Sequence, residues 1–118
     1  MVNPLGTLGE NIASKYLQGK GHQVIDRNFR TRLGEIDIIS RYQDTLIFIE
    51  VKARIDDRRG KPYEAVTPQK LAHLKKALYY YLMIKKITKE KMRIDVVSII
   101  FNNDRSVREL RHFENVGV

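Results

Sequence analysis

Three side chains in the segment Gly34–Arg54 have the types and spacing of a hydrolytic metal site. The segment reads GEIDIISRYQDTLIFIEVKAR, which predicts two strands joined by a short polar turn. A turn symmetric about Gln43 and Asp44 places Asp37 opposite Glu50, with Cβ atoms roughly 4.5–5.5 Å apart. A bulge or a loop of odd length would instead shift this register by one residue.

Two opposed carboxylates repel each other, so this pair calls for a compensating cation. A hard divalent ion such as Mg²⁺ or Mn²⁺ suits carboxylate oxygens, and Asp37 and Glu50 are therefore the expected metal ligands. The main-chain carbonyl of Val51 can complete the metal shell, while its side chain points to the core. Strand alternation puts Lys52 on the same face as Glu50, where an ammonium can stabilise charge on a phosphate or help to activate water.

A solvated Glu-x-Lys pair and a solvated Asp37 are the ordinary alternative to a functional site. The neighbours of these charges argue against it, because they are almost all large and apolar: Ile36, Ile38, Ile39, Ile47, Phe48, Ile49 and Val51. Such strands are typical of the centre of a sheet, with both faces covered. Charges there are unusual unless they are paired or functional, so the pattern favours a functional site.

The rest of the chain predicts the elements that hold this hairpin. A first helix is expected over Leu5–Leu17, and its apolar face comprises Leu5, Leu8, Ile12, Tyr16 and Leu17. A second helix begins with Thr67 as N-cap and Pro68 at the first position, and its buried stripe comprises Leu71, Leu74, Leu78 and Leu82. Strands are expected over Gln23–Arg30, Glu35–Ser40, Leu46–Ala53, Ile94–Phe101 and Val107–Phe113. The order α-β-β-β-α-β-β predicts one sheet with helices packed on it.

Composition limits the class of protein and its partners. A chain of 118 residues with 42% hydrophobic and 31% charged residues is expected to form a single soluble domain over 1–118. No apolar run is long enough for a bilayer, MVNPLGTLGEN lacks the pattern of a signal peptide, and the absence of cysteine fits a cytoplasmic protein. The net charge of +8 favours polyanions, which include nucleic acid, acidic membranes and acidic proteins.

The motifs GTLGENIASKYL, RNFRTRLGEIDII, LIFIEVKAR and RIDVV, with a lysine-rich helix before the last, resemble the YraN family of bacterial predicted endonucleases. That family belongs to the PD-(D/E)xK nuclease superfamily and is similar to archaeal Holliday junction resolvases. The resemblance implies a restriction-endonuclease-like α/β core of αβββαβ type, with a mixed central sheet flanked by helices. It also implies Mg²⁺ or Mn²⁺ as cofactor, DNA as substrate and a possible homodimer.

The same resemblance assigns roles to residues. It implies Asp37 and Glu50 as metal ligands, Lys52 as the catalytic lysine and Glu10, on the first helix, as a further member of the site. Glu10 as an ordinary surface residue is the alternative. The strand has Glu-Ile-Asp in place of the namesake Pro-Asp, so Glu35 lies on the face of Asp37 and can compete for the metal.

Other polar residues carry weaker expectations. The loop cations Arg54, Arg58, Arg59 and Lys61 either follow a phosphate backbone or are merely solvated. Gln69 and Lys70 either approach the site or are ordinary residues of a first helical turn. Asp95 is expected to form a structural salt bridge with an arginine, and the run Tyr79–Tyr81 to divide between core and surface. No histidine among His22, His73 and His112 has the spacing of a metal ligand.

These observations favour a metal-dependent nuclease that hydrolyses phosphodiester bonds in structured or branched DNA. A non-catalytic nucleic-acid-binding module on a nuclease fold is the first alternative, and a protein-interaction subunit with a basic surface is the second. The complete set of Asp37, Glu50 and Lys52 favours the nuclease, because a pure binder gains nothing from two carboxylates that repel phosphate.

Overall fold

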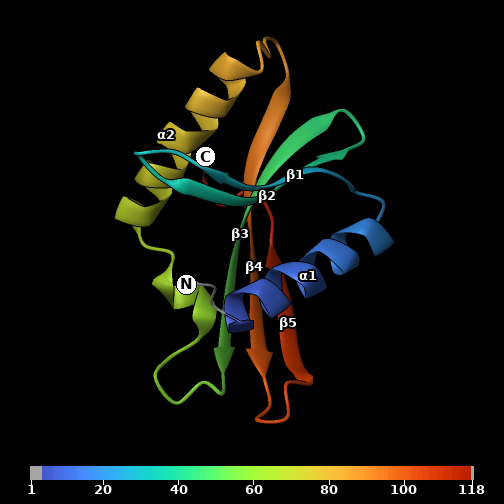
Figure 1. The fold of residues 1–118 in the computed structure, drawn as a ribbon, viewed down its shortest axis with the longest axis vertical. Coiled ribbons are helices and arrows are strands. Elements are labelled where there is room, and N and C mark those ends of the chain that lie inside the picture. The colour runs from blue at the N-terminus through green and yellow to red at the C-terminus, as the bar shows by residue number, and fades with distance from the viewer. Residues whose placement is uncertain (1–3, 118) are drawn as a thin grey trace.

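A computed structural model describes residues 4–117, which form a five-stranded sheet and two helices (Figure 1). Residues 1–3 and 118, which the single-domain prediction also covered, lie outside the described range. The elements are α1 (Pro4–Gly19), β1 (Gln23–Arg30), β2 (Glu35–Tyr42), β3 (Thr45–Ile55), the short 3₁₀ helix η1 (Pro62–Ala65), α2 (Pro68–Ile84), β4 (Lys91–Phe101) and β5 (Val107–Phe113). The predicted mixed sheet of the α/β class is confirmed, and its arrangement is compatible with a restriction-endonuclease-like core.

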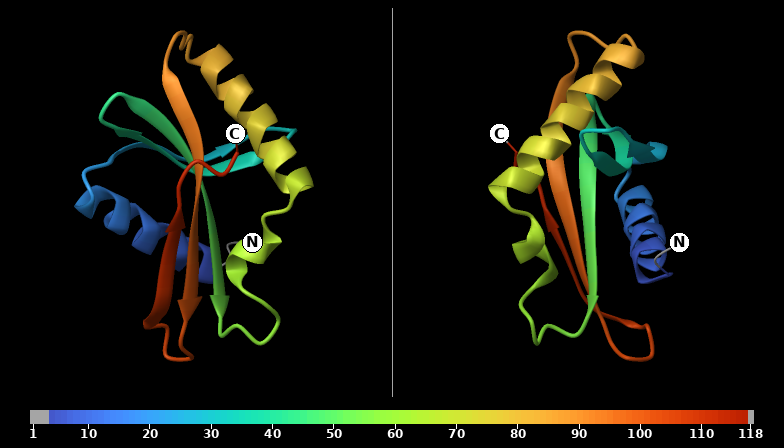
Figure 2. Two further views of the ribbon diagram at one scale, coloured as in Figure 1. Left: turned by 180° about the vertical axis from the view of Figure 1, so that it is seen from behind. Right: turned by 60° about the vertical axis from the view of Figure 1, so that its left-hand side comes forward.

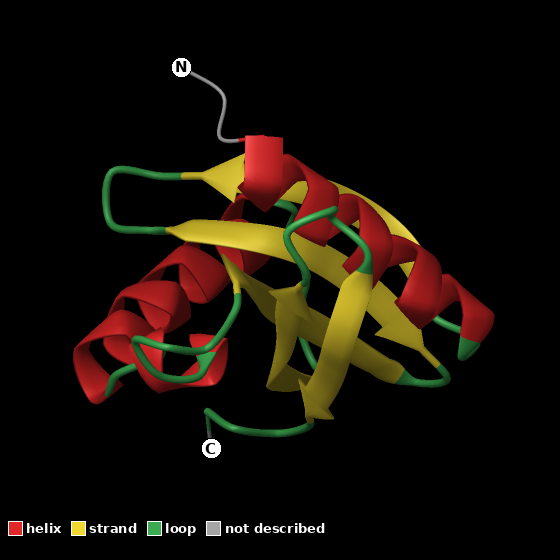
Figure 3. Ribbon diagram, turned by 90° about the horizontal axis from the view of Figure 1, so that it is seen from below, coloured by secondary structure: helices red, strands yellow, loops and turns green. Residues whose placement is uncertain are grey.

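The sheet has the strand order β1-β2-β3-β4-β5, and only the pair of β3 and β4 is parallel. Parallel strands need a crossover, and α2 provides it between β3 and β4. The two helices lie on opposite faces of the sheet (Figures 2 and 3). Each helix therefore closes its own apolar core, as the run of apolar residues in the central strands predicted.

The predicted register of the β2–β3 hairpin is confirmed. Tyr42 pairs with Thr45 and Ser40 with Ile47, so the turn is symmetric, as expected. Main-chain pairing continues to Ile38 and Ile49 and stops there. Beyond this point β3 runs on beside β4, while β2 stays paired with β1 and crosses away (Figure 1). The hairpin thus opens at the next two residues in register, which are Asp37 and Glu50.

The face of α1 that meets the sheet differs from the predicted one. Of the five apolar residues expected there, only Leu17 is fully buried, and the other four are half-buried around the contact. The buried centre of the helix consists of small residues, Gly9, Ala13 and Ser14. Apolar periodicity finds large side chains and passes over small ones, although small ones are what a close helix–sheet contact requires.

The second helix largely follows its prediction. The hydroxyl oxygen of Thr67 accepts a hydrogen bond from the main-chain nitrogen of Lys70 at 3.2 Å, which confirms the N-cap. The buried stripe contains Leu74 and Leu78 together with Ala77 and Tyr81, whereas the expected Leu71 and Leu82 are only partly buried. Within the tyrosine run, Tyr81 lies in the core and its two neighbours are exposed, so the predicted division between core and surface is confirmed.

Two glycines allow close approaches that position acidic residues. A Cβ atom on Gly9 would lie 2.9 Å from the Cβ of Ala53 on β3. A Cβ on Gly34 would lie 2.7 Å from the main-chain oxygen of His73 on α2. Each glycine directly precedes a glutamate, Glu10 or Glu35, that faces the open end of the hairpin. Within residues 4–117, neither helix has the length and apolar character needed to cross a membrane.

The contact of α1 with β3 yields a first prediction. Gly9→Ala forces the helix away from Ala53, so it should lower the free energy of unfolding by about 1–2 kcal/mol despite the better helix propensity of alanine. Gly19→Ala is the matched control, because no atom lies within 4 Å of the position that its Cβ would take. Urea unfolding of both variants measures the difference. An equal effect of the two substitutions would contradict the close contact.

Candidate active site

The carboxyl groups of Asp37 and Glu50 meet where β2 and β3 part. Both residues are buried, with 8% and 4% of their surface exposed. The Asp37 side chain reaches across to β3, where its Oδ2 accepts a hydrogen bond of 2.8 Å from the main-chain N–H of Val51. A side chain thus replaces the main-chain pairing that stops one residue earlier. The predicted juxtaposition of Asp37 with Glu50 is therefore present in the structure.

This arrangement shifts the protonation of Asp37. Burial, and to a smaller extent the negative charge of Glu50, raise the pKa of Asp37 to about 7, although the hydrogen bond from Val51 lowers it. In its protonated form Asp37 can donate a hydrogen bond to Glu50. Charging two adjacent buried carboxylates is unfavourable, so near neutral pH Asp37 retains its proton or the pair requires a cation.

Lys52 lies beside this pair, as strand alternation predicted. Its Nζ is 3.5 Å from Oε1 of Glu50, and the lysine side chain is 28% exposed while that of Glu50 is 5% exposed. The ammonium is therefore held at the mouth of the site with access to solvent. The side chain of Val51 packs on the α1 side of the sheet, also as expected, which leaves its main chain beside Asp37.

Glu10 joins the same hollow from α1. The hollow is lined by Glu10, Asp37, Glu50, Lys52, Glu35 and Lys70, among others. Burial raises the pKa of Glu10, the charge of Asp37 adds to the rise, and Arg27 opposes it. Nη2 of Arg27 lies 3.7 Å from Oε1 of Glu10. Glu10 thus faces the site, but its carboxylate is paired with an arginine rather than with the other two acids.

The donor set fits a hard divalent cation. Asp37 and Glu50 offer buried carboxylate oxygens in contact with each other, and the Val51 carbonyl is a further oxygen on the same strand. Mg²⁺ typically takes one or two protein carboxylates and keeps several waters, so a third acidic ligand is not required. Glu35 lines the hollow as well, where Nε of Arg30 lies 3.4 Å from its Oε1. Its predicted competition for the metal stays untested.

A second group of possible ligands lies at the opposite face of the sheet. In the part of the chain that is described, single ligand atoms of Asp95, His112 and Glu114 lie within 4.8 Å of one another. Arg93 already supplies a cation there, because its guanidinium contacts Oδ1 of Asp95 at 3.0 Å and Oε1 of Glu114 at 2.9 Å. The predicted salt bridge of Asp95 with an arginine is confirmed. Nε2 of His112 lies within hydrogen-bond distance of Oδ2 of the same aspartate, at 2.7 Å.

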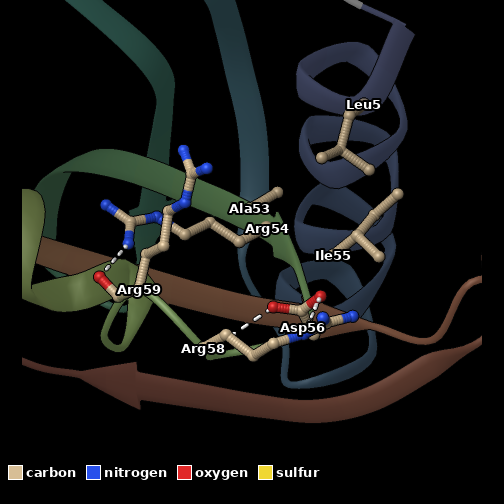
Figure 4. A pocket seen from close by; sticks show the side chains of 7 residues that line it. All are labelled: Leu5, Ala53, Arg54, Ile55, Asp56, Arg58 and Arg59. Carbon is tan, nitrogen blue, oxygen red and sulfur yellow. Dashed lines mark hydrogen bonds and ion pairs between the residues drawn. The ribbon is translucent and has the colours of Figure 1, made fainter.

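The basic loop after β3 lines a separate hollow together with the end of β3 and Leu5 of α1 (Figure 4). Within the loop, Nε of Arg58 lies 3.3 Å from Oδ2 of Asp56, and Nζ of Lys61 lies 2.9 Å from Oδ2 of Asp57. Arg54, which was predicted in the loop, lies instead in β3, because the strand continues to Ile55, and its guanidinium donates to the main-chain oxygen of Arg59. Much of the positive charge that the sequence placed here is therefore balanced locally.

Residue patterns alone did not place Arg27 and Arg30 at the site, although both line its hollow. In a regular strand, residues three apart point to opposite faces. The pairing of β1 with β2 is regular from Asp26 to Arg30, but Asn28, which lies between the two arginines, adopts a positive φ of 55°. This local distortion breaks the alternation. Lys70 also lines the hollow, whereas Gln69 is not among its lining residues and is exposed.

Comparisons with known proteins find a family and relatives that match most of this chain. The model of a family described as "Uncharacterised protein family UPF0102" matches residues 9–99. A UPF0102 protein of Syntrophomonas wolfei is 41% identical over 115 residues, which cover 98% of each chain. A UPF0102 protein of Clostridium kluyveri is 43% identical over 107 residues, 91% of this chain and 88% of the relative. The matched range contains Glu10, Asp37, Glu50 and Lys52.

The shifted pKa of Asp37 yields a second prediction. Because the folded pKa is raised, the folded state binds more protons than the unfolded state between about pH 4 and pH 7. In the absence of metal, stability should therefore fall as the pH rises through this window and level off above it. Asp37→Asn removes the buried charge and should raise the free energy of unfolding by about 2–4 kcal/mol at pH 8, with little effect at pH 4.5.

Urea unfolding in EDTA at these two pH values measures the effect. Asp104→Asn serves as a control of opposite sign, because hydrogen bonds from Ser106 lower the pKa of Asp104. That variant should be slightly less stable than the wild type at pH 8. Destabilisation by Asp37→Asn of the same size at both pH values would contradict the account of the carboxyl pair.

Proposed function

This chain belongs to the UPF0102 family, the YraN family of predicted endonucleases, and on that premise we propose that it is a metal-dependent nuclease that hydrolyses phosphodiester bonds in structured or branched DNA. One observation carries the proposal. Asp37 and Glu50 are buried in contact with each other, and Lys52 lies 3.5 Å from Glu50 at the mouth of a solvent-accessible hollow. Burying such a pair lowers the stability of the sheet, so a purely structural role does not account for it.

The roles of the side chains follow from their positions. Asp37 and Glu50, with the carbonyl of Val51, would hold Mg²⁺ or Mn²⁺. When bound, such an ion polarises a phosphoryl oxygen and lowers the pKa of a coordinated water. The hydrogen bond from Val51 fixes the orientation of the Asp37 carboxylate. Loss of the Asp37 proton on cation binding would leave its carboxylate charged and able to coordinate the ion.

Lys52 is placed to act on the phosphate itself. Its ammonium is anchored by Glu50 yet partly exposed, so it can reach a phosphate oxygen that enters the hollow and stabilise charge developing there. Glu10 lines the hollow from α1, its pKa is raised by burial, and its carboxyl group is placed to accept or return a proton in the hollow. Its contact with Arg27 keeps it in place.

The experiment is a cleavage assay with Mg²⁺ and with Mn²⁺ on single-stranded, duplex, flap and four-way DNA of related sequence. Glu50→Gln and Lys52→Met should each lower the cleavage rate by at least about 100-fold. Affinity for the same DNA, measured in EDTA, should be retained by Lys52→Met with a modest loss and retained or increased by Glu50→Gln. Glu64→Gln and Lys15→Met are matched controls at exposed positions outside the hollow, and they should cleave as the wild type does.

Two outcomes would overturn the proposal. Cleavage that survives Glu50→Gln would mean that the activity arises elsewhere or from a contaminant. A wild-type protein that binds the DNA forms but cuts none of them with either metal would make the non-catalytic nucleic-acid-binding module the better interpretation.

A further inference from the structure

A groove extends from the candidate active site between the β1–β2 loop and α2. Arg30 at the end of β1, with Arg32 and Leu33 of the β1–β2 loop, forms one wall, and Lys70, His73 and Lys76 of α2 form the other. We call this the basic groove. It shares Arg30, Glu35 and Lys70 with the hollow that contains Asp37 and Glu50. A chain-like molecule lying in the groove would therefore run directly into the site.

The loop wall of the groove is a fixed structure. Main-chain N–H groups of Leu33 and Gly34 both donate to the hydroxyl oxygen of Thr31 at 3.0 Å, and that hydroxyl donates to the carbonyl of Gly34 at 2.9 Å. Gly34 in turn sits against the main chain of His73 so closely that no side chain would fit. The loop is thereby held on α2 with Arg32 and Leu33 facing outward, and 53% of the Leu33 surface is exposed.

The helix wall is a single stripe. Lys70, His73, Lys76 and Tyr80 follow one another at spacings of three, three and four residues, which places them on one face of a helix. Tyr80 is 43% exposed and shares a further hollow with Arg30 and the loop residues 31–33. Cationic and aromatic side chains therefore alternate along the helix wall, while the loop wall presents Arg30 and Arg32 beside the apolar Leu33.

The cations of the groove are largely available to a ligand. Over residues 4–117, no carboxylate lies within 4.0 Å of a charged nitrogen of Arg32, Lys70 or Lys76, and only Arg30 is paired, with Glu35. The loop after β3 differs, because Asp56 and Asp57 hold its Arg58 and Lys61. Unbalanced positive charge thus lines the groove more than the loop that the sequence singled out.

We propose that the basic groove binds a single-stranded stretch of DNA and leads its backbone to Asp37 and Glu50. A single strand presents phosphates to the cations and unstacked base faces to Tyr80, His73 and Leu33. A duplex buries its base faces in its own stack, so these side chains would gain nothing from it. This inference rests on the proposed function and specifies its substrate: DNA with an unpaired stretch next to the bond that is cut.

Binding in EDTA tests the groove separately from cleavage. Fluorescence anisotropy would follow a labelled single-stranded oligodeoxynucleotide, and the same sequence as a duplex, over a range of salt concentrations. The double variant Arg32→Gln, Lys76→Gln should reduce the slope of log affinity against log salt by about 1.4 on the single strand, since each phosphate contact contributes about 0.7. Tyr80→Ala should weaken single-strand binding at least about fivefold, the lower end of one lost stacking contact, and leave duplex binding unchanged.

Two double variants with the same loss of charge serve as comparisons. Lys15→Gln, Arg105→Gln changes exposed positions outside both hollows and should behave as the wild type does. Arg58→Gln, Lys61→Gln tests the rival route along the loop after β3 and should have the smaller effect. Circular dichroism of every variant checks that the fold is kept.

A larger loss from the loop variant than from the groove variant would overturn the inference, and so would equal effects of Tyr80→Ala on single strand and duplex. Failure of the wild type to bind the single strand at low salt would do the same. Cleavage with metal but none of the groove effects would leave the proposed function standing and remove this inference. Groove-dependent binding without any cleavage would leave the single-strand binding by the groove standing and remove the proposed nuclease function.

Discussion

The hydrogen bond from Val51 N–H to the carboxylate of Asp37 is the contact on which the rest of the site depends. It lies where β2 leaves β3, so a side chain continues the pairing that the main chain gives up. This brings the Asp37 and Glu50 carboxyls together in a buried position, which is unfavourable by itself. The fold tolerates that cost because apolar cores on both faces of the central strands stabilise the sheet around it.

The remaining elements can be understood as support for this opening in the sheet. Gly9 lets α1 lie against β3, and Glu10 follows it into the hollow. Gly34 lets the β1–β2 loop lie against α2, and this contact places the flanking residues Glu35 and Arg30 beside the groove. The buried acids Asp37 and Glu50 thus lie within the site, while exposed cations such as Arg32 and Lys76 line the groove that leads to it. Such a separation allows a phosphate chain to be attracted by one set of residues and acted on by another.

The sequence predicted the hairpin well because strand alternation and a symmetric turn leave little freedom. The register, the shared face of Glu50 and Lys52, and the N-cap at Thr67 all follow from local rules. It predicted the helix contact of α1 less well, since the closest approach uses Gly9 and Ala13, which apolar periodicity does not detect. The presence of both Arg27 and Arg30 at the site depends on the positive φ of Asn28 between them, which no simple pattern reveals. The local pairing of Arg58 and Lys61 likewise needed three-dimensional contacts to be seen.

The most direct test of the central claim is the binding of Mn²⁺, measured by calorimetry and by water-proton relaxation at pH 8. The account predicts weak binding by the wild type that is lost in the double variant Asp37→Asn, Glu50→Gln. It also predicts unchanged binding by Glu114→Gln, which alters the other group of possible ligands at Asp95 and His112. Equal binding by the wild type and the double variant, or loss of binding in Glu114→Gln alone, would contradict the claim that Asp37 and Glu50 form the metal site.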